Sequence, residues 1–162
     1  MSTRAESLAA RVEQGAQALA AFAEQLSDRE WQTICADDGR TVGVLTHHVA
    51  TALLGETGIV KQLASGQPLA GLTWPMVDEG NAAHAHEHAR AGQREAAELL
   101  RQNGAIAAEA IRLLGDEQLD VAAPNSLHAD APVTVQFWIE NHPLAHAYRH
   151  LASMRAALSA LE

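Results

Sequence analysis

The chain of 162 residues suits one domain, taken as residues 1–162, and is long enough to bury a full core. Its formal net charge of -9 and its pI of about 5.4 exclude a nucleic-acid surface or an anionic-membrane surface, because no basic block offsets the repulsion. Alanine and leucine dominate and aromatic residues make up only 4%, which favours an all-α fold.

The cysteine content and the hydropathy bear on the compartment. Cys35 is the single cysteine, so no disulfide can form within the chain and a reducing compartment is expected. No stretch approaches the roughly 18 apolar residues of a membrane span, and the N-terminal residues lack the continuous apolar segment of a signal peptide. We therefore expect a cytoplasmic protein without a membrane segment.

The first predicted helix covers Thr3–Leu26. Its apolar positions recur at alternating steps of four and three residues, as on the buried face of a bundle helix: Leu8, Val12, Gly15, Leu19, Phe22 and Leu26. The segment Arg29–Arg40 follows, with Trp31, Ile34 and Cys35 as expected apolar anchors and a turn at its end.

The second predicted helix covers Val42–Ala64, with Thr41 as its N-cap. His48 lies at the edge of its apolar stripe, whereas His47 points about 100° away. The segment Ser65–Val77 then contains two glycines and two prolines and is predicted to be non-helical. Thirteen extended residues reach a little over 40 Å, which is enough to cross a bundle and make the second and third helices parallel. A short-range loop of the same length stays possible.

Two further helices complete the prediction. The third is expected to run unbroken from Asp78 to Leu114, because its apolar phase carries through Asn103 and Gly104. A loop over Gly115–Pro132 and a last helix over Val133–Leu158 follow, with a kink or a restart at Pro143. Four helices of this kind predict a four-helix bundle.

Histidines on two of these helices suggest a metal site. His142, His146 and His150 recur every four residues, and imidazoles at that spacing on a helix can point at one cation. If the last helix runs antiparallel to the second, His48 lies at the level of His146 and His150. Three protein ligands with a fourth position open are typical of a catalytic zinc. For any one of these histidines alone, an ordinary half-buried residue with a hydrogen bond is the simpler interpretation.

Other residues are weaker candidates, and His47 is one of them, as a possible second-shell group or substrate contact. His84 and His88 share a helix face, and they are possible second-shell groups, substrate contacts or extra ligands; a solvated helix end is the alternative that the sequence favours. His142 suits a polar cap better than a fourth ligand. Glu140 is a candidate to orient a ligand imidazole, with plain solvation as the alternative.

Three segments resemble a known family, the DinB/YfiT-like metalloenzymes. TVGVLTHHVA (41–50) is similar to the family's second-helix motif, in which V-x-x-L-x-x-H ends in the first ligand, here His48. HAYRHLASM (146–154) resembles the H-x-x-x-H motif that supplies the other two ligands, His146 and His150. RQNGAIAAEAIRLLGDEQLD (101–120) is similar to the third helix and the following loop of many members.

The resemblance implies a four-helix bundle in up-down-down-up order. It also implies a divalent metal, often zinc or nickel, held by His48, His146 and His150, and frequent homodimers. Members with an assigned activity are mostly transferases and isomerases that use a low-molecular-weight thiol. The mycothiol isomerase branch has a glutamate where this chain has His146, which argues against a maleylpyruvate-type isomerase.

The function expected from the sequence is therefore a metal-dependent enzyme acting on a small-molecule substrate. A thiol-dependent S-transferase or a related hydrolase is the form that we expect. The alternatives are a non-catalytic metal- or ligand-binding stress protein with the same bundle and a helical dimer whose histidines have no metal role.

Overall fold

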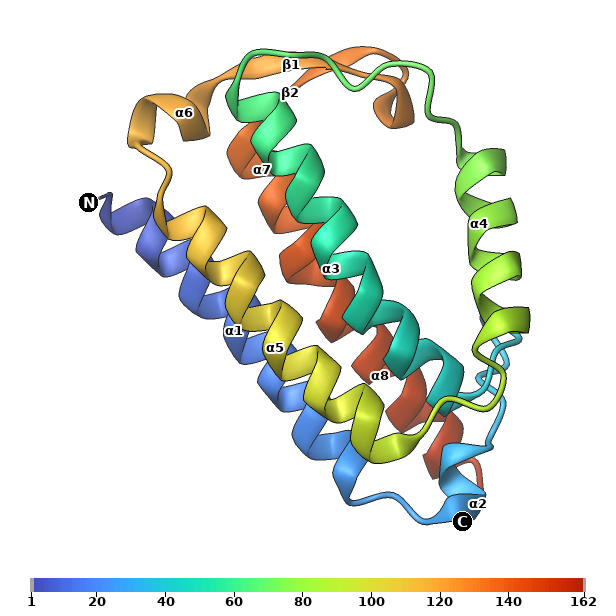
Figure 1. Cartoon of the computed structure of the whole chain (residues 1–162). Helices are drawn as coiled ribbons and strands as arrows, with labels where there is room; N and C mark the ends of the chain where they lie inside the picture. Colours follow the sequence, from blue (N-terminus) through green and yellow to red (C-terminus); the bar gives the residue numbers. More distant parts are fainter. Residues whose placement is uncertain (1, 162) are drawn as a thin grey trace.

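The computed structural model describes residues 2–161, and four helical segments dominate it (Figure 1). They are α1 (Thr3–Glu24), α3 (Val42–Ala64), α5 (Gln93–Arg112) and a C-terminal segment that contains α7 (Val135–Ile139) and α8 (Ala145–Ser159). In Figure 1, α1 and the C-terminal segment run in one direction and α3 and α5 in the other. The predicted four-helix bundle in up-down-down-up order is confirmed.

Local signals explain where α3 begins and ends. The Thr41 hydroxyl accepts a hydrogen bond from the Val44 amide, which caps the first turn. Gly66 has a φ of 78°, a left-handed conformation that ends helices at low cost for glycine. The bounds predicted for this helix agree with the observed ones. By contrast, α1 ends at Glu24 rather than at Leu26.

The segment between α1 and α3 is less helical than its composition suggests. Only α2 (Asp28–Trp31) forms there, stabilised by a capping box in which Ser27 and Glu30 exchange hydrogen bonds. Trp31 and Cys35 are buried, but Ile34 is 61% exposed, so its prediction as an anchor is wrong. The Trp31 ring packs directly on the backbone of Gly43, where a Cβ atom would lie 2.6 Å from it.

The prediction of one helix from Asp78 to Leu114 is wrong. Two helices occupy this segment, α4 (Trp74–Glu87) and α5, with a break over residues 88–92. The two helices serve different surfaces: α5 packs its small apolar residues against α1 and α3, whereas α4, described over its whole length, buries no side chain fully. A continuous helix could not place the α4 and α5 residues on these two different surfaces. The extended backbone of Gly92 lets α5 start in a new direction.

The connection between α3 and α5 combines residues 65–73 with α4. Thr73 caps α4 and Pro75 lies in its first turn, so this helix begins four residues earlier than predicted. Figure 1 shows α4 standing apart from the four long segments and running back toward the beginning of α3. The predicted parallel arrangement of α3 and α5 is therefore correct, although a helix and not an extended chain makes the return.

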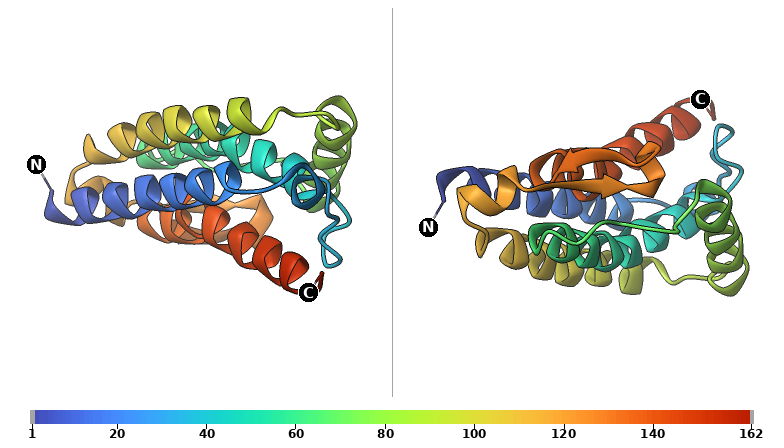
Figure 2. Two further views of the ribbon diagram at one scale, coloured as in Figure 1. Left: turned by 90° about the horizontal axis from the view of Figure 1, so that it is seen from below. Right: turned by 90° about the horizontal axis from the view of Figure 1, so that it is seen from above.

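Residues 115–134 form short elements instead of the predicted continuous loop. These are α6 (Asp116–Asp120), β1 (Ala122–Asn125), a 3₁₀ turn at Ser126–His128 and β2 (Ala131–Thr134). The two strands pair antiparallel, with Ala122 opposite Thr134. Figure 1 shows this hairpin beyond one end of the four-helix core, and both views of Figure 2 show α4 to one side of it.

The C-terminal segment passes Pro143 through one π-helical turn, η2 (Glu140–Leu144), between α7 and α8. Pro143 has no amide hydrogen to donate to the carbonyl of residue 139, so the pattern of helical hydrogen bonds must change there. The wider π turn accommodates the missing hydrogen bond, and the helical segment continues. The predicted kink or restart at Pro143 is thus realised as a π turn.

A single apolar core lies between the four segments. Its largest fully buried side chains include Leu8, Leu45, Leu100, Trp138, Ile139 and Met154. Over the residues that the structure describes, helices long and apolar enough to cross a membrane are absent.

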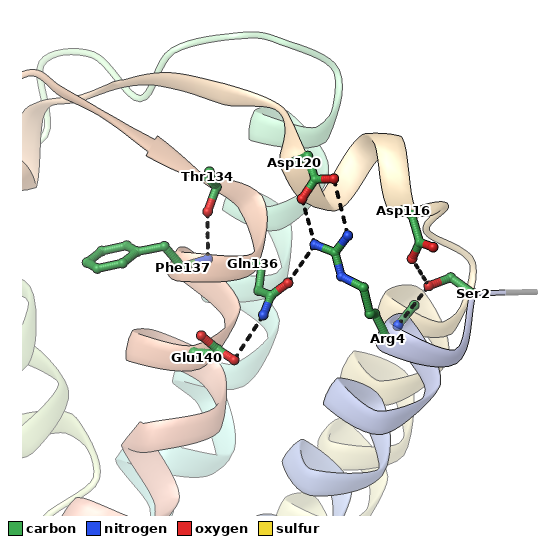
Figure 3. A network of polar contacts seen from close by, with 9 residues as sticks. Ser2, Arg4, Asp116, Asp120, Thr134, Gln136, Phe137 and Glu140 are labelled. Atoms are coloured by element: carbon green, nitrogen blue, oxygen red, sulfur yellow. Dashed lines mark hydrogen bonds and ion pairs between the residues drawn. The ribbon is translucent and has the colours of Figure 1, made fainter.

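A polar network joins the beginning of α1 to α6 and α7 (Figure 3). The Arg4 guanidinium donates to Asp120 at 2.6 Å and to Gln136 at 2.7 Å. The Gln136 amide in turn donates to Glu140 at 3.2 Å, and Arg11 lies 3.6 Å from the same carboxylate. Glu140 is therefore engaged on the outer side of the C-terminal segment.

Candidate metal centre

The first histidine cluster lies between α3 and α8. His48 of α3 meets His146 and His150 of α8, and one ring nitrogen from each lies within 4.8 Å of the other two. The Nε2 atoms of His48 and His146 are 3.1 Å apart. The antiparallel course of α3 and α8 produces this meeting, because it places the second turn of α3 beside the first two turns of α8.

The protonation of these imidazoles suits a metal site. Burial, followed by the nearby His146, lowers the pKa of His48 to about 2, and burial lowers the pKa of His150 to about 4. Both rings are therefore neutral at pH 7 and offer lone pairs. Zinc–nitrogen bonds of about 2.0–2.1 Å in a tetrahedral site place ligand nitrogens roughly 3.3 Å apart. The donor set and its spacing fit a divalent ion.

Glu56 orients this cluster. Its Oε1 atom lies 2.8 Å from His146 Nδ1, and both side chains are only 16% exposed. The carboxylate accepts a hydrogen bond from Nδ1–H, which leaves the lone pair on Nε2, the atom that faces His48. Glu56 thus has the position for which Glu140 was a candidate, whereas Glu140 accepts a hydrogen bond from Gln136 outside the cluster. The sequence signal was a carboxylate interrupting the α3 stripe eight residues, about two turns, after His48.

A pocket of about 430 Å³ opens beside the cluster, lined by residues of α3, α4 and the C-terminal segment. The rings of Trp74 and Trp138 contribute apolar lining, and His48, His146 and His150 are also part of the lining. Arg40 and Arg149 add positive charge. The size and the lining suit a small molecule with an apolar body and an anionic group.

Arg40 is held in place by a neighbour yet keeps one donor free of protein partners. Its Nε and Nη2 atoms donate to Asp38 at 2.5 and 2.7 Å. Its Nη1 atom is buried and has no hydrogen-bond partner among the described residues. A buried charged donor of this kind is expensive to leave unsatisfied, so it is suited to an acceptor brought by a ligand.

His142 does not join the cluster. Its ring stacks on Trp138 with the centroids 3.6 Å apart, and its Nε2 atom lies 3.2 Å from that of His128. Burial, with a further contribution from His128, lowers its pKa to about 4. Its interpretation as a fourth ligand therefore finds no support, although it lines the pocket. His128 was missed because the position of a loop residue cannot be inferred from helical spacing.

A second histidine cluster lies on the other side of the same α3 turn. His47 Nδ1 is 2.9 Å from His84 Nε2, and His88 stacks on His47 with the ring centroids 4.0 Å apart. His84 and His88 turn toward His47 and do not line the pocket, so the expected contact with a pocket-bound substrate is not found. The residues of α4 that line the pocket are Trp74, Val77 and Asn81.

Comparisons with known proteins bear on the fold. Protein-family models gave no match to this sequence, and neither did curated proteins. Among solved structures, the chain is similar to YfiT from Bacillus subtilis, with a TM-score of 0.67 and 18% sequence identity over 95% of this chain and 90% of that one. YfiT is described as a probable metal-dependent hydrolase with an unusual four-helix bundle topology. At this identity the similarity shows the shared fold, and the DinB/YfiT-like bundle expected from the motifs is confirmed.

Proposed function

We propose that the chain is a divalent-metal-dependent enzyme acting on a small molecule, with the ion held by His48, His146 and His150. The observation that carries this proposal is a cluster of three imidazoles, with one ring nitrogen from each within 4.8 Å of the others, that lines a pocket of substrate size. An ion bound there would lower the pKa of a bound thiol or water and supply a nucleophile at neutral pH.

A small thiol is the nucleophile that we propose, in an S-transferase reaction with an electrophilic substrate. Low-molecular-weight thiols commonly carry a carboxylate, and the unpaired Arg40 Nη1 donor in the pocket wall suits that group. The indole rings of Trp74 and Trp138 would bind the apolar part of the electrophile and exclude water. Zinc and nickel are the proposed metals, because imidazole nitrogen suits both.

Hydrolysis is the second candidate, because the fold is shared with YfiT, a probable metal-dependent hydrolase. In this reaction water would replace the thiol at the open position. The Glu56 Oε2 atom is buried without a hydrogen-bond partner in the described part of the chain, so it is available to accept a proton from that water. A protein that binds metal without turnover is the alternative to both reactions.

Metal analysis tests the ligand set. Protein purified without a histidine tag should hold about one tightly bound ion per chain, and the double variant His146→Ala/His150→Ala should lose it. Elemental analysis after dialysis measures the content. Full tight occupancy in the double variant would refute the proposed ligands.

The neighbouring pair His47 and His48 gives a matched comparison. Consecutive helical residues point about 100° apart, so only His48 can face the first cluster. We expect His48→Ala to abolish tight metal binding and His47→Ala to leave it nearly intact, as measured by competition with a chromophoric chelator. If His47→Ala abolished tight metal binding and His48→Ala did not, the tight site would lie on the His47 face of α3, contrary to the proposal.

Turnover assays separate the two reactions from plain binding. Metal-loaded protein should conjugate a generic electrophile such as monochlorobimane only when a small thiol is present, and Arg40→Gln should raise the KM for a carboxylate-bearing thiol. Arg11, which pairs with Glu140 away from the pocket, provides the control Arg11→Gln. Thiol-independent cleavage of esters or amides would favour the hydrolase, and no turnover of either kind would favour a binding protein.

A further inference from the structure

We propose that His47, His84 and His88 form a second site for a divalent transition-metal ion, which ties the end of α4 to α3. This site is separate from the one that carries the proposed function, and it would take an ion that prefers nitrogen ligands.

The geometry of the three rings supports the site. One ring nitrogen from each lies within 4.8 Å of the others, and the ring centroids of His84 and His88 are 4.6 Å apart. His47 Nδ1 and His84 Nε2 approach to 2.9 Å, a little closer than the roughly 3.3 Å between ligands of one tetrahedral ion. His84 Nδ1 is buried and has no hydrogen-bond partner within residues 2–161.

The weak packing of α4 gives the cluster a structural role. This helix, which is described throughout, buries none of its side chains fully, and its contact with the apolar core is made by the partly buried Val77. His84 and His88 lie four residues apart at its end and meet His47 in the second turn of α3. An ion shared by the three rings would add to this small hydrophobic contact.

The chemistry of the cluster selects the kind of ion. An imidazole binds a metal ion through the lone pair of an unprotonated ring nitrogen, and one ring nitrogen of each residue lies within 4.8 Å of the other two. The carboxylates of Glu87 and Glu95 act on His47 from α4 and α5 and would partly balance the charge of a cation. Imidazole ligands suit zinc, copper and nickel, whereas magnesium and calcium prefer oxygen.

The two proposed ions would influence each other. His47 and His48 are consecutive, and the His84 ring lies 5.6 Å from the His48 ring. Two cations held so close repel each other, so the second should bind more weakly than the first. Because Trp74, Val77 and Asn81 of α4 line the pocket, an ion that fixes α4 would also fix one pocket wall.

Zinc titration tests the second site. Tag-free protein stripped with a chelator should take up two zinc ions per chain in equilibrium dialysis. His84→Ala/His88→Ala should take up one, and so should His146→Ala/His150→Ala, each losing a different ion. His86 lies on the same helix and is exposed, so His86→Ala is the matched control and should still bind two.

Hydrogen exchange supplies a readout that is independent of stoichiometry. In His146→Ala/His150→Ala, which keeps only the second site, zinc should slow amide exchange within α4. The same measurement on His84→Ala/His88→Ala should show no zinc effect there, and His84→Gln/His88→Gln repeats the test if the alanine variant fails to fold. Uptake by the unmodified chain of a single ion that His84→Ala/His88→Ala retains, or uptake of two ions by the His84/His88 variants, would overturn the proposal. Unchanged exchange in α4 on zinc addition would overturn it as well. A failure of the first site alone would instead appear as one ion that is lost with His84 and His88.

Discussion

Glu56 decides which nitrogen of His146 faces the cluster. A carboxylate 2.8 Å from Nδ1 holds the proton on that atom and keeps Nε2 free as a ligand. The contact also fixes the plane of the ring, because both side chains are largely buried. Three histidines on two helices would otherwise have several ring orientations, and only some of them converge on one ion.

Replacing Glu56 by glutamine should weaken tight metal binding by about 10- to 100-fold, the usual cost of losing an orienting partner. The glutamine keeps the size of the side chain but removes the charge that holds the Nδ1 proton. Chelator competition measures the affinity. The control is Glu140→Gln, which alters a carboxylate outside this cluster and should leave the affinity unchanged. Equal effects of the two substitutions would contradict the orienting role.

Among the individual site residues, the sequence predicted those whose positions follow from helical periodicity. His48, His146 and His150 were found because spacing on a helix fixes the face on which a side chain lies. The position of Glu56 follows from the same helical spacing, but a single carboxylate in an apolar stripe is usually an ordinary solvated side chain. Arg40 and His128 lie outside long helices, so the place of Arg40 in the pocket wall and the contact of His128 with His142 depend on loop conformations that spacing cannot predict.

The pairing of α1 with α5 depends on small residues. Gly104 of α5 lies so close to α1 that a Cβ atom there would be 2.5 Å from the Ala16 side chain. The buried side chains of both helices include many alanines, which allow the backbones to approach. Close approach increases dispersion contacts along the whole pair, but it leaves no room for another methyl group.

Gly104→Ala should therefore destabilise the protein by about 1–3 kcal/mol, because the added methyl group forces α1 and α5 apart. Gly58→Ala is the matched change on α3, where a Cβ atom meets nothing within 4 Å. That substitution should stabilise the protein by about 0.5–1 kcal/mol through helix propensity. Urea unfolding followed by tryptophan fluorescence measures both. A neutral Gly104→Ala would show that the helix pair can separate at no cost.

Element boundaries were predicted best where a cap and an apolar stripe agree, as in α3. They were wrong where tertiary context changes the role of a segment. The apolar phase that carries through Asn103 and Gly104 belongs to α5, whereas the histidine-rich residues of α4 pack on α3. The strands β1 and β2 were missed because four-residue strands with a proline in each give almost no periodic signal.

The molecule as a whole buries several imidazoles in their neutral form. The pKa of His48 falls to about 2 and those of His142 and His150 to about 4, against an ordinary value of 6.5. Between pH 6.5 and 4 the unfolded chain therefore binds more protons than the folded chain. Linkage then requires the free energy of unfolding to fall as the pH falls through this window.

Metal-free protein should accordingly lose stability between about pH 7 and pH 5, with His48 alone accounting for on the order of 1–2 kcal/mol. Urea unfolding at the two pH values measures the loss. His150→Gln should reduce it by removing one titrating ring, whereas His86→Ala, at an exposed position, should not. Constant stability across this range would mean that the buried rings do not stay neutral in the fold.

The general class of the molecule was predictable, since composition and helical motifs indicated the bundle and its up-down-down-up order. The homodimer and the cytoplasmic location stay predictions. Size-exclusion chromatography with light scattering measures the oligomeric state. The position of α4 outside the core could not be predicted, because it depends on contacts between side chains rather than on an apolar pattern.

The order of the helices also bears on how the chain folds. α1 pairs with α5, and its ion pairs span long separations: Glu24 to Arg101 over 77 residues and Glu13 to Arg112 over 99. Such contacts form only after long loops have closed, which slows folding relative to a bundle whose neighbouring helices follow one another in sequence. During synthesis the apolar stripe of α1 emerges first and stays uncovered until α5 has been made. The nascent chain should therefore depend on chaperones over that interval more than a sequentially paired bundle of equal length.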